Sequence, residues 1–134
     1  MARKRLPPND PREWLNRARS NLARAQKPLE GAYLEDFCFD AQQAAEKAIK
    51  AVFMACGLTF PFVHDLGRLL ALLIQGGIRV PKYVIESDRL TRYAVTSRYP
   101  GLSAPITKRE HRHALRMATG VLRWATRLID RRCP

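Results

Sequence analysis

The segment from Tyr33 to Cys56 constrains the fold of this chain more than any other part. Six alanines give it a strong helix propensity and allow neighbouring helices to approach closely, namely Ala41, Ala44, Ala45, Ala48, Ala51 and Ala55. Larger apolar side chains, such as Phe37, Ile49 and Phe53, spread around much of its helical wheel. We therefore expect a helix that is contacted on several sides, at the centre of a bundle, and that ends at Gly57.

Four other segments have apolar residues at helical spacing, and residues rich in proline and glycine separate them. They cover about 11–29, 64–75, 81–94 and 107–129. The first and last begin with capping-box patterns, Asp10 to Glu13 and Thr107 to Glu110. No segment alternates polar and apolar residues as a half-buried strand would. The sequence predicts an all-α fold, an antiparallel up-and-down bundle of about five helices.

The chain has 134 residues, enough for one domain. We expect a flexible basic arm over 1–9 and a single helical domain over 10–132. No apolar run is long enough to span a membrane, and the basic start lacks the apolar core of a secretory signal. The three cysteines, Cys38, Cys56 and Cys133, are not spaced as the ligands of a metal ion. The sequence therefore predicts free thiols, as in a cytoplasmic protein. It predicts neither a bound metal nor a cofactor.

The formal net charge of +12 comes entirely from the two ends of the chain. Residues 1–27 carry eight basic and two acidic side chains, and residues 107–134 carry the same numbers. The residues between them hold eight of each sign. The charge therefore predicts attraction to an anionic partner at particular surfaces rather than over the whole molecule.

The last predicted helix carries a basic ridge, defined as the arginines that fall within about 100 degrees of its wheel, opposite the apolar stripe. These are Arg109, Arg112, Arg116, Arg123, Arg127 and Arg131. Such a ridge can follow phosphates or meet an acidic protein surface, and it can also be an ordinary solvated face. Residues 28–46 hold acidic but no basic side chains, so pairing of the ridge with this stretch of another copy is a further alternative.

The histidines form no metal site. His111 and His113 diverge by about 200 degrees on a helix, so they cannot share a metal ion. Asp65, directly after His64, is placed to cap the third helix. No common phosphate-loop, metalloprotease or hydrolase motif is present.

One combination of motifs resembles a known family. The phrase FCFDAQQAAEKAIK over 37–50 is followed by His-Asp-Leu at 64–66 and by Arg-Tyr-Pro at 98–100. With Trp14 and Ala18 in the first helix, this order is similar to the HEPN domain, from about Pro11 to Ile129. The resemblance implies a bundle of four or five helices that forms a homodimer. It also implies a minimal nucleotidyltransferase as partner, in a system like a toxin–antitoxin pair.

Many HEPN proteins are metal-independent ribonucleases, with an arginine and a histidine separated by four to six residues. Arg98 is the corresponding arginine, but Ser103, Ala104 and Pro105 stand where the histidine is required. We therefore expect a non-catalytic module that binds nucleotide or RNA phosphates as a homodimer. A ribonuclease with a rearranged site, using His64 or His113 with Arg98, and a structural module that binds an acidic protein through the basic ridge are the alternatives.

The predicted binding site combines the middle of the second helix with the two downstream motifs. Gln43, Lys47 and Lys50 share one helical face because they lie four and three residues apart. The full predicted set is Gln43, Lys47, Lys50, His64, Arg98 and Tyr99. Lysine and arginine would hold phosphate and Tyr99 would stack on a base. The alternative is that these side chains serve helix packing and helix termination.

Overall fold

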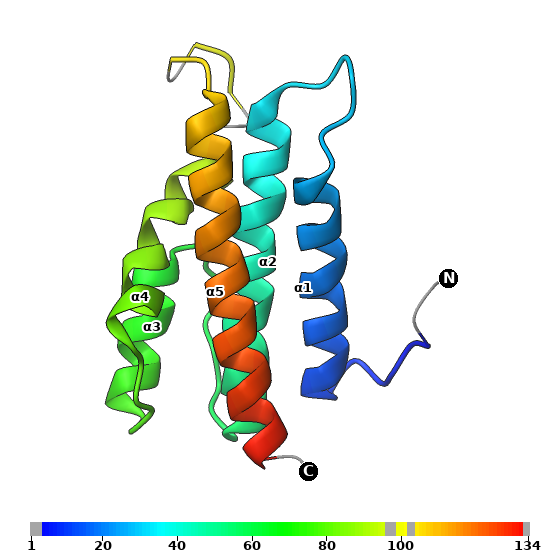
Figure 1. The fold of residues 1–134 in the computed structure, drawn as a ribbon. Coiled ribbons are helices and arrows are strands. Elements are labelled where there is room, and N and C mark those ends of the chain that lie inside the picture. Colours follow the sequence, from blue (N-terminus) through cyan, green and yellow to red (C-terminus); the bar gives the residue numbers. More distant parts are fainter. Residues whose placement is uncertain (1–3, 96–98, 102–103, 133–134) are drawn as a thin grey trace.

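A computed structural model describes residues 4–95, 99–101 and 104–132. Its elements are α1 (Pro11–Gln26), α2 (Leu34–Ala55), α3 (Leu66–Gln75), α4 (Lys82–Ile85), the 3-10 helix η1 (Glu86–Ala94) and α5 (Lys108–Arg132). No strand occurs among the described residues, and the prediction of an all-α bundle is confirmed. In Figure 1, α1 runs antiparallel to α2, and α2 and α5 run side by side in the same direction.

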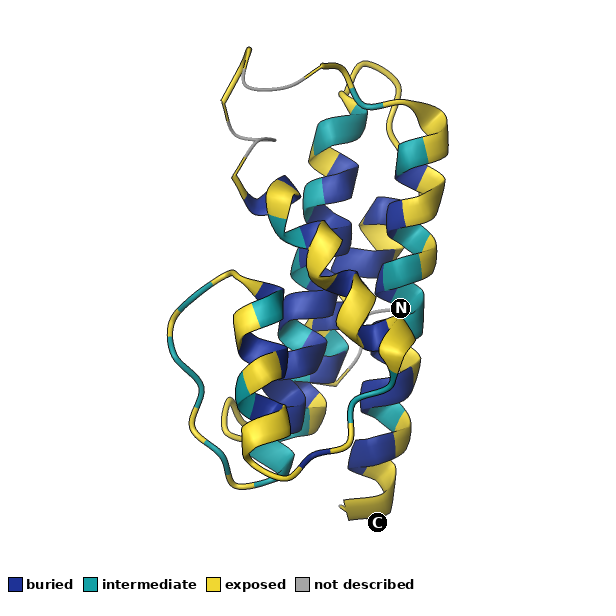
Figure 2. Ribbon diagram, turned by 90° about the vertical axis from the view of Figure 1, so that its left-hand side faces the viewer, coloured by how far each residue is buried: buried dark blue, intermediate teal, exposed yellow. Residues whose placement is uncertain are grey.

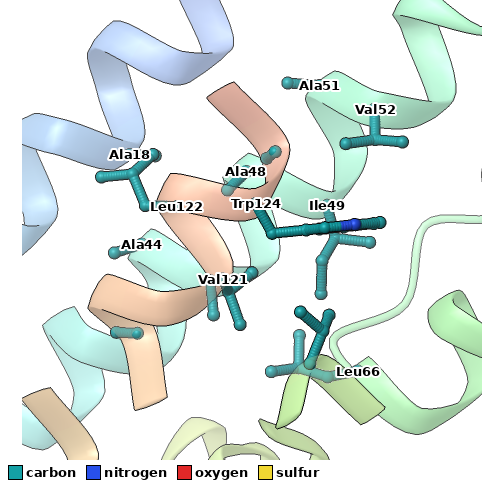
Figure 3. Close-up of a cluster of buried hydrophobic side chains, with 14 of the residues drawn as sticks. Ala18, Ala44, Ala48, Ile49, Ala51, Val52, Leu66, Val121, Leu122 and Trp124 are labelled. Carbon is teal, nitrogen blue, oxygen red and sulfur yellow. The ribbon is translucent and has the colours of Figure 1, made fainter. Parts of the chain in front are cut away.

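The predicted position of α2 at the centre of the bundle is also confirmed. It packs against α1 on one side and α5 on another, and it also contacts α3 and η1. Ala44 and Ala48 have no exposed surface and lie close to α5 (Figure 3). Because alanine projects so little, the α1, α2 and α5 backbones pack closely around these positions. The buried residues face the interior all along the bundle (Figure 2).

The helix ends agree with the predicted caps. Asp10 accepts a hydrogen bond from the Arg12 amide, and Asp65 accepts one from the Arg68 amide. The Thr107 hydroxyl oxygen accepts from the Glu110 amide, and Glu110 accepts in return from the Thr107 amide, which completes a capping box.

Two details at the first helix differ from expectation. The Glu13 carboxylate is not turned to the Asp10 amide but accepts from the Leu6 amide and from Arg17. The first helix, predicted over about 11–29, ends at Gln26, so Leu29 lies beyond its end and is exposed. Residues 4–9 run along the start of α1, and the Trp14 indole donates to the Pro8 carbonyl at 3.0 Å.

The fourth predicted helix is divided into α4 and η1. Its buried residues are Val84, Ser87, Leu90 and Tyr93, which repeat every three residues, followed by Ala94. A spacing of three matches the turn of a 3-10 helix, which brings these four side chains onto one line, whereas an α-helix would spread them. This three-residue spacing of buried side chains is the sequence feature that fits a 3-10 helix over Glu86–Ala94.

Of the helices in the described residues, none has the length and apolar character needed to cross a membrane. The same residues contain no group of three or more His, Cys, Asp or Glu side chains that could hold a metal ion.

Candidate functional site

The basic ridge lies on the outer surface of α5. Its six arginines are all exposed, while Ala118, Val121 and Ala125 on the other side of the helix are buried. None of the six forms an ion pair with another described residue. By contrast, Arg17, Arg24 and Arg92 each pair with a carboxylate. The ridge is therefore a run of cationic groups whose charge the described part of the chain does not neutralise.

The acidic stretch is largely engaged within the molecule. Asp40 is buried and accepts from Arg24 at 2.7 Å and from Asn21 at 3.0 Å. Glu46 is buried, and Glu35 accepts from the Ile106 amide. Only the remaining two acidic side chains of residues 28–46, Glu30 and Asp36, are exposed. This stretch therefore offers the ridge of another copy little free negative charge.

Glu46 is the centre of a polar cluster between α2 and the start of α3. Its carboxylate accepts from Lys50 at 2.9 Å and from Gln42 at 3.1 Å. It also lies 2.9 Å from Nδ1 of His64 and accepts a longer bond from Gln43. Three of the predicted site residues, Gln43, Lys50 and His64, are thus brought together around one carboxylate.

This cluster holds a charge inside the bundle. Burial acts to raise the pKa of Glu46, but the hydrogen bonds from Lys50, Gln42 and His64 outweigh burial and lower it. Lys50 is only 6% exposed, and its ammonium lies 5.3 Å above the Phe60 ring. Because Lys50 is enclosed and paired, its geometry agrees with the packing interpretation of this residue better than with phosphate binding.

His64 is placed differently from Lys50, because its side chain is 59% exposed. Glu46 contacts Nδ1, and the His64 backbone carbonyl accepts from Gln42 at 3.1 Å. Glu46 therefore fixes one ring nitrogen and Gln42 fixes the backbone of His64, while the ring remains accessible to solvent. This is the arrangement in which a carboxylate orients a histidine for proton transfer.

Lys47 points to α1 rather than to Glu46. Its Nζ donates to Oδ1 of Asn21 at 2.6 Å, and Asn21 in turn donates to Asp40. Burial lowers the pKa of Lys47, and the neighbouring Arg17 and Arg24 lower it further, against the attraction of Glu46 and Asp40. Lys47 therefore has a neutral hydrogen-bond acceptor and lies among other cations, a setting that favours an anion nearby.

Arg98 lies outside the described residues. Tyr99 is 58% exposed in the loop between η1 and α5. His111 is buried on the inner side of α5, and its Nε2 lies 2.7 Å from the Ala25 carbonyl. His113 lines a small hollow together with Arg89 and Arg116.

Sequence reasoning missed the partners that α1 supplies. Asn21 holds Lys47, and Glu13 anchors the arm through the Leu6 amide. A polar residue at 21 between the apolar positions Ala18, Leu22 and Ala25 was the available signal, since a polar side chain on a buried face requires a partner.

Comparison with known proteins agrees with this architecture. The model of the HEPN domain family matches residues 11–129. The crystal structure of TT1696 from Thermus thermophilus is similar, with a TM-score of 0.78 and 35% identity, over 90% of this chain and 98% of that one. The crystal structure of ST0689, an archaeal HEPN homologue, has a TM-score of 0.72 and 27% identity, over 95% and 99%. No match was found among curated proteins. With the family model covering most of its length, the chain belongs to the HEPN domain family.

Proposed function

We propose that this chain is a non-catalytic HEPN module that binds the phosphate groups of RNA or a nucleotide. The observation that carries the proposal is the basic ridge of α5, which is exposed and has no carboxylate partner among the described residues. Phosphates spaced along a strand match a row of guanidinium groups spaced along one side of a helix. The proposed assembly is a homodimer that acts with a minimal nucleotidyltransferase in a toxin–antitoxin-like system.

Two observations support binding rather than catalysis or self-pairing. The positions that would supply the family's histidine after Arg98 are serine, alanine and proline, so that acid–base group is missing. Pairing of the ridge with residues 28–46 of another copy is disfavoured because Asp40 and Glu46 are buried and paired within their own chain.

The test is an RNA-binding titration at several salt concentrations. The protein should bind single-stranded RNA with an affinity that falls steeply with salt, because binding releases counterions. Replacing Arg112, Arg116 and Arg123 together by glutamate should weaken binding by more than about tenfold and reduce the slope of log K against log salt by about 2.

The matched control reverses three exposed cations elsewhere, Arg68, Arg79 and Lys82, and so makes the same change in net charge. It should retain most of the affinity. Equal loss in both variants would show that net charge rather than the ridge drives binding, and binding to acidic proteins but not to RNA would favour the structural-module alternative.

A ribonuclease with a rearranged site is the second candidate, because Glu46 orients His64 while the imidazole stays exposed. On this alternative, RNA is cleaved in the presence of EDTA, and cleavage is lost in both His64→Ala and Arg98→Ala. Intact RNA after prolonged incubation with the wild-type protein supports the non-catalytic proposal. Cleavage that depends on these two residues contradicts it.

A further inference from the structure

A groove lies between the N-terminal arm and the helices α1 and α2, and Lys47 is the one predicted site residue among those described in its lining. It consists of two adjoining hollows of about 460 and 410 Å³, which share Arg5, Glu13 and Arg17 in their walls. Each hollow has the volume of a site for a small organic molecule. The arm, which leads into the start of α1 (Figure 1), forms one wall of both.

One end of the groove is apolar and aromatic. Leu6, Pro8 and Trp14 line it. The Trp14 ring is held in place by its hydrogen bond to the Pro8 carbonyl and by an edge-to-face contact with Phe60, with centroids 5.6 Å apart. An indole that is fixed in this way has already lost its rotational freedom, so it can stack on a flat aromatic ring at little further entropic cost.

The other groups in the groove are mostly cationic. Lys47, Arg17 and Arg5 line the same hollow as Trp14, and Lys4 and Arg19 line the adjoining one. Glu13 is the acidic residue in both described linings, and its carboxylate is engaged by the Leu6 amide and by Nε of Arg17 at 2.9 and 2.8 Å.

Lys47 is the cation best prepared for an anion. Its Nζ uses one proton on Asn21 and has two more to donate, and no carboxylate is bonded to it among the described residues. Burial lowers its pKa, and a bound phosphate would counteract this by favouring the charged ammonium.

We propose that this groove binds a nucleoside phosphate. The base stacks on Trp14 between Leu6 and Pro8, and the phosphate is bound by Lys47, Arg17 and Arg5. An aromatic surface and a cluster of cations within one groove match a ligand that carries a flat ring and a phosphate on the same small molecule. The proposal is separate from the function proposed for the basic ridge, because none of the ridge arginines lines the groove.

The ligand is either a free nucleotide or the phosphorylated end of an RNA strand, and the experiment separates them. The full chain is titrated with AMP, with adenosine, with inorganic phosphate and with a 5′-phosphorylated RNA trimer. Binding is followed by the indole N–H resonances in two-dimensional NMR. The Trp14 signal reports on the groove, and Trp124, which is buried on α5, serves as the internal control.

We expect AMP to shift the Trp14 signal and to bind about tenfold more tightly than adenosine or inorganic phosphate, since each lacks one half of the recognised group. Tighter binding of the trimer than of AMP identifies an RNA end as the source, and the reverse identifies a free nucleotide. Absence of any AMP-induced shift at millimolar concentration overturns the proposal. So does binding of inorganic phosphate as tight as that of AMP, because the base would then contribute nothing.

Variants locate the site. Lys47→Met removes the ammonium but keeps an unbranched side chain, and it should weaken AMP binding about tenfold. Lys27→Met, on an exposed lysine just after α1, should leave AMP binding unchanged. Trp14→Phe retains an aromatic ring but lacks the reporter indole, so its binding is measured by calorimetry. It should bind AMP more weakly while keeping its affinity for phosphate. The ridge variant with Arg112, Arg116 and Arg123 replaced should bind AMP like the wild type. If the ridge variant loses AMP binding while Lys47→Met retains AMP binding, the groove is not the nucleotide site. This conclusion does not depend on the result of the RNA titration.

Discussion

At the scale of single residues, the buried carboxylate of Glu46 connects α2 with the segment that precedes α3. It accepts hydrogen bonds from Lys50 and Gln42 and contacts His64, and the sequence separation between Glu46 and His64 is 18 residues. A buried charge is tolerated only when its partners compensate for the lost hydration. Every buried side-chain nitrogen and oxygen in the part of the chain that the structure describes has a hydrogen-bond partner, so the compensation extends over the described core.

Glu46 should make the protein sensitive to acid. The pKa of its carboxyl is lowered in the folded state from 4.5, so the unfolded chain binds more protons between the two values. The stabilisation is fully present above about pH 5 and is lost as the pH falls through the folded pKa. Urea unfolding between pH 3 and 7 should show this decline for the wild type.

Glu46→Gln should lack that part of the pH dependence and should be less stable at pH 7 by about 3 kcal/mol, because Lys50 would be left buried without its counter-charge. Glu30→Gln, at an exposed position, is the control and should behave like the wild type. A Glu46→Gln protein that loses stability in acid as steeply as the wild type would show that other carboxylates are responsible.

The cysteines illustrate how burial controls reactivity at the same scale. Burial raises the pKa of the Cys38 thiol to about 12, so almost none of it is thiolate at neutral pH. Cys38 is not part of a disulfide, and its side chain is completely enclosed. Cys38 is therefore a free thiol, as predicted, and it serves as a small residue of the core.

At the scale of elements, the alanines of α2 set how closely α1 and α5 approach. Ala44, Ala48 and Ala51 have no exposed surface, and Ala18 of α1 and Ala118 and Ala125 of α5 are enclosed in the same core. The three helices thus meet through small side chains, with Ile49, Val52 and Trp124 filling the wider spaces (Figure 3).

Enlarging one of these alanines should therefore destabilise the bundle. Ala48→Leu adds three carbon atoms at a position with no exposed surface, and we expect a loss of about 1 to 3 kcal/mol in the free energy of unfolding. Ala71→Leu, at an exposed position on α3, makes the same chemical change and should be neutral to within about 0.5 kcal/mol. Thermal unfolding followed by circular dichroism measures both. Equal stability of the two variants would mean that the interface around α2 is not closely packed.

At the scale of the whole molecule, the uneven charge has a structural explanation. The arginines of α5 lie on its outer side, and the cations of the arm and of α1 line the groove. Two acidic residues of the middle of the chain, Asp40 and Glu46, are buried and pair with Arg24 and Lys50, while five others are exposed, namely Glu30, Asp36, Asp65, Glu86 and Asp88. The excess positive charge of the exposed surface therefore comes from the arm, α1 and α5.

The proposed homodimer can be tested against the charge distribution. If the dimer does not depend on the basic ridge, the variant with Arg112, Arg116 and Arg123 replaced by glutamate should have the same molar mass as the wild type in size-exclusion chromatography with light scattering. A wild-type monomer at micromolar concentration would contradict the homodimer. A dimeric wild type with a monomeric variant would instead support self-association through the ridge.

The sequence by itself determined the features that depend on neighbours along the chain. Helix periodicity placed the arginines of α5 opposite its apolar stripe, and local hydrogen bonding made Asp10, Asp65 and Thr107 caps, because these patterns span only one to a few turns. The family resemblance could also be recognised from the sequence, because each motif that carries it is a short run of neighbouring residues.

Only the tertiary structure decided which polar groups meet. Gln43, Lys47 and Lys50 share a helical face in sequence, yet Lys50 turns to Glu46 and Lys47 crosses to Asn21, which lies 26 residues away. The groove, too, exists only because the arm folds back against α1 and leaves Trp14 beside Lys47. Periodicity tells which side of a helix is polar, but the choice of partner depends on how helices pack against one another, and that is settled by the burial of the whole core.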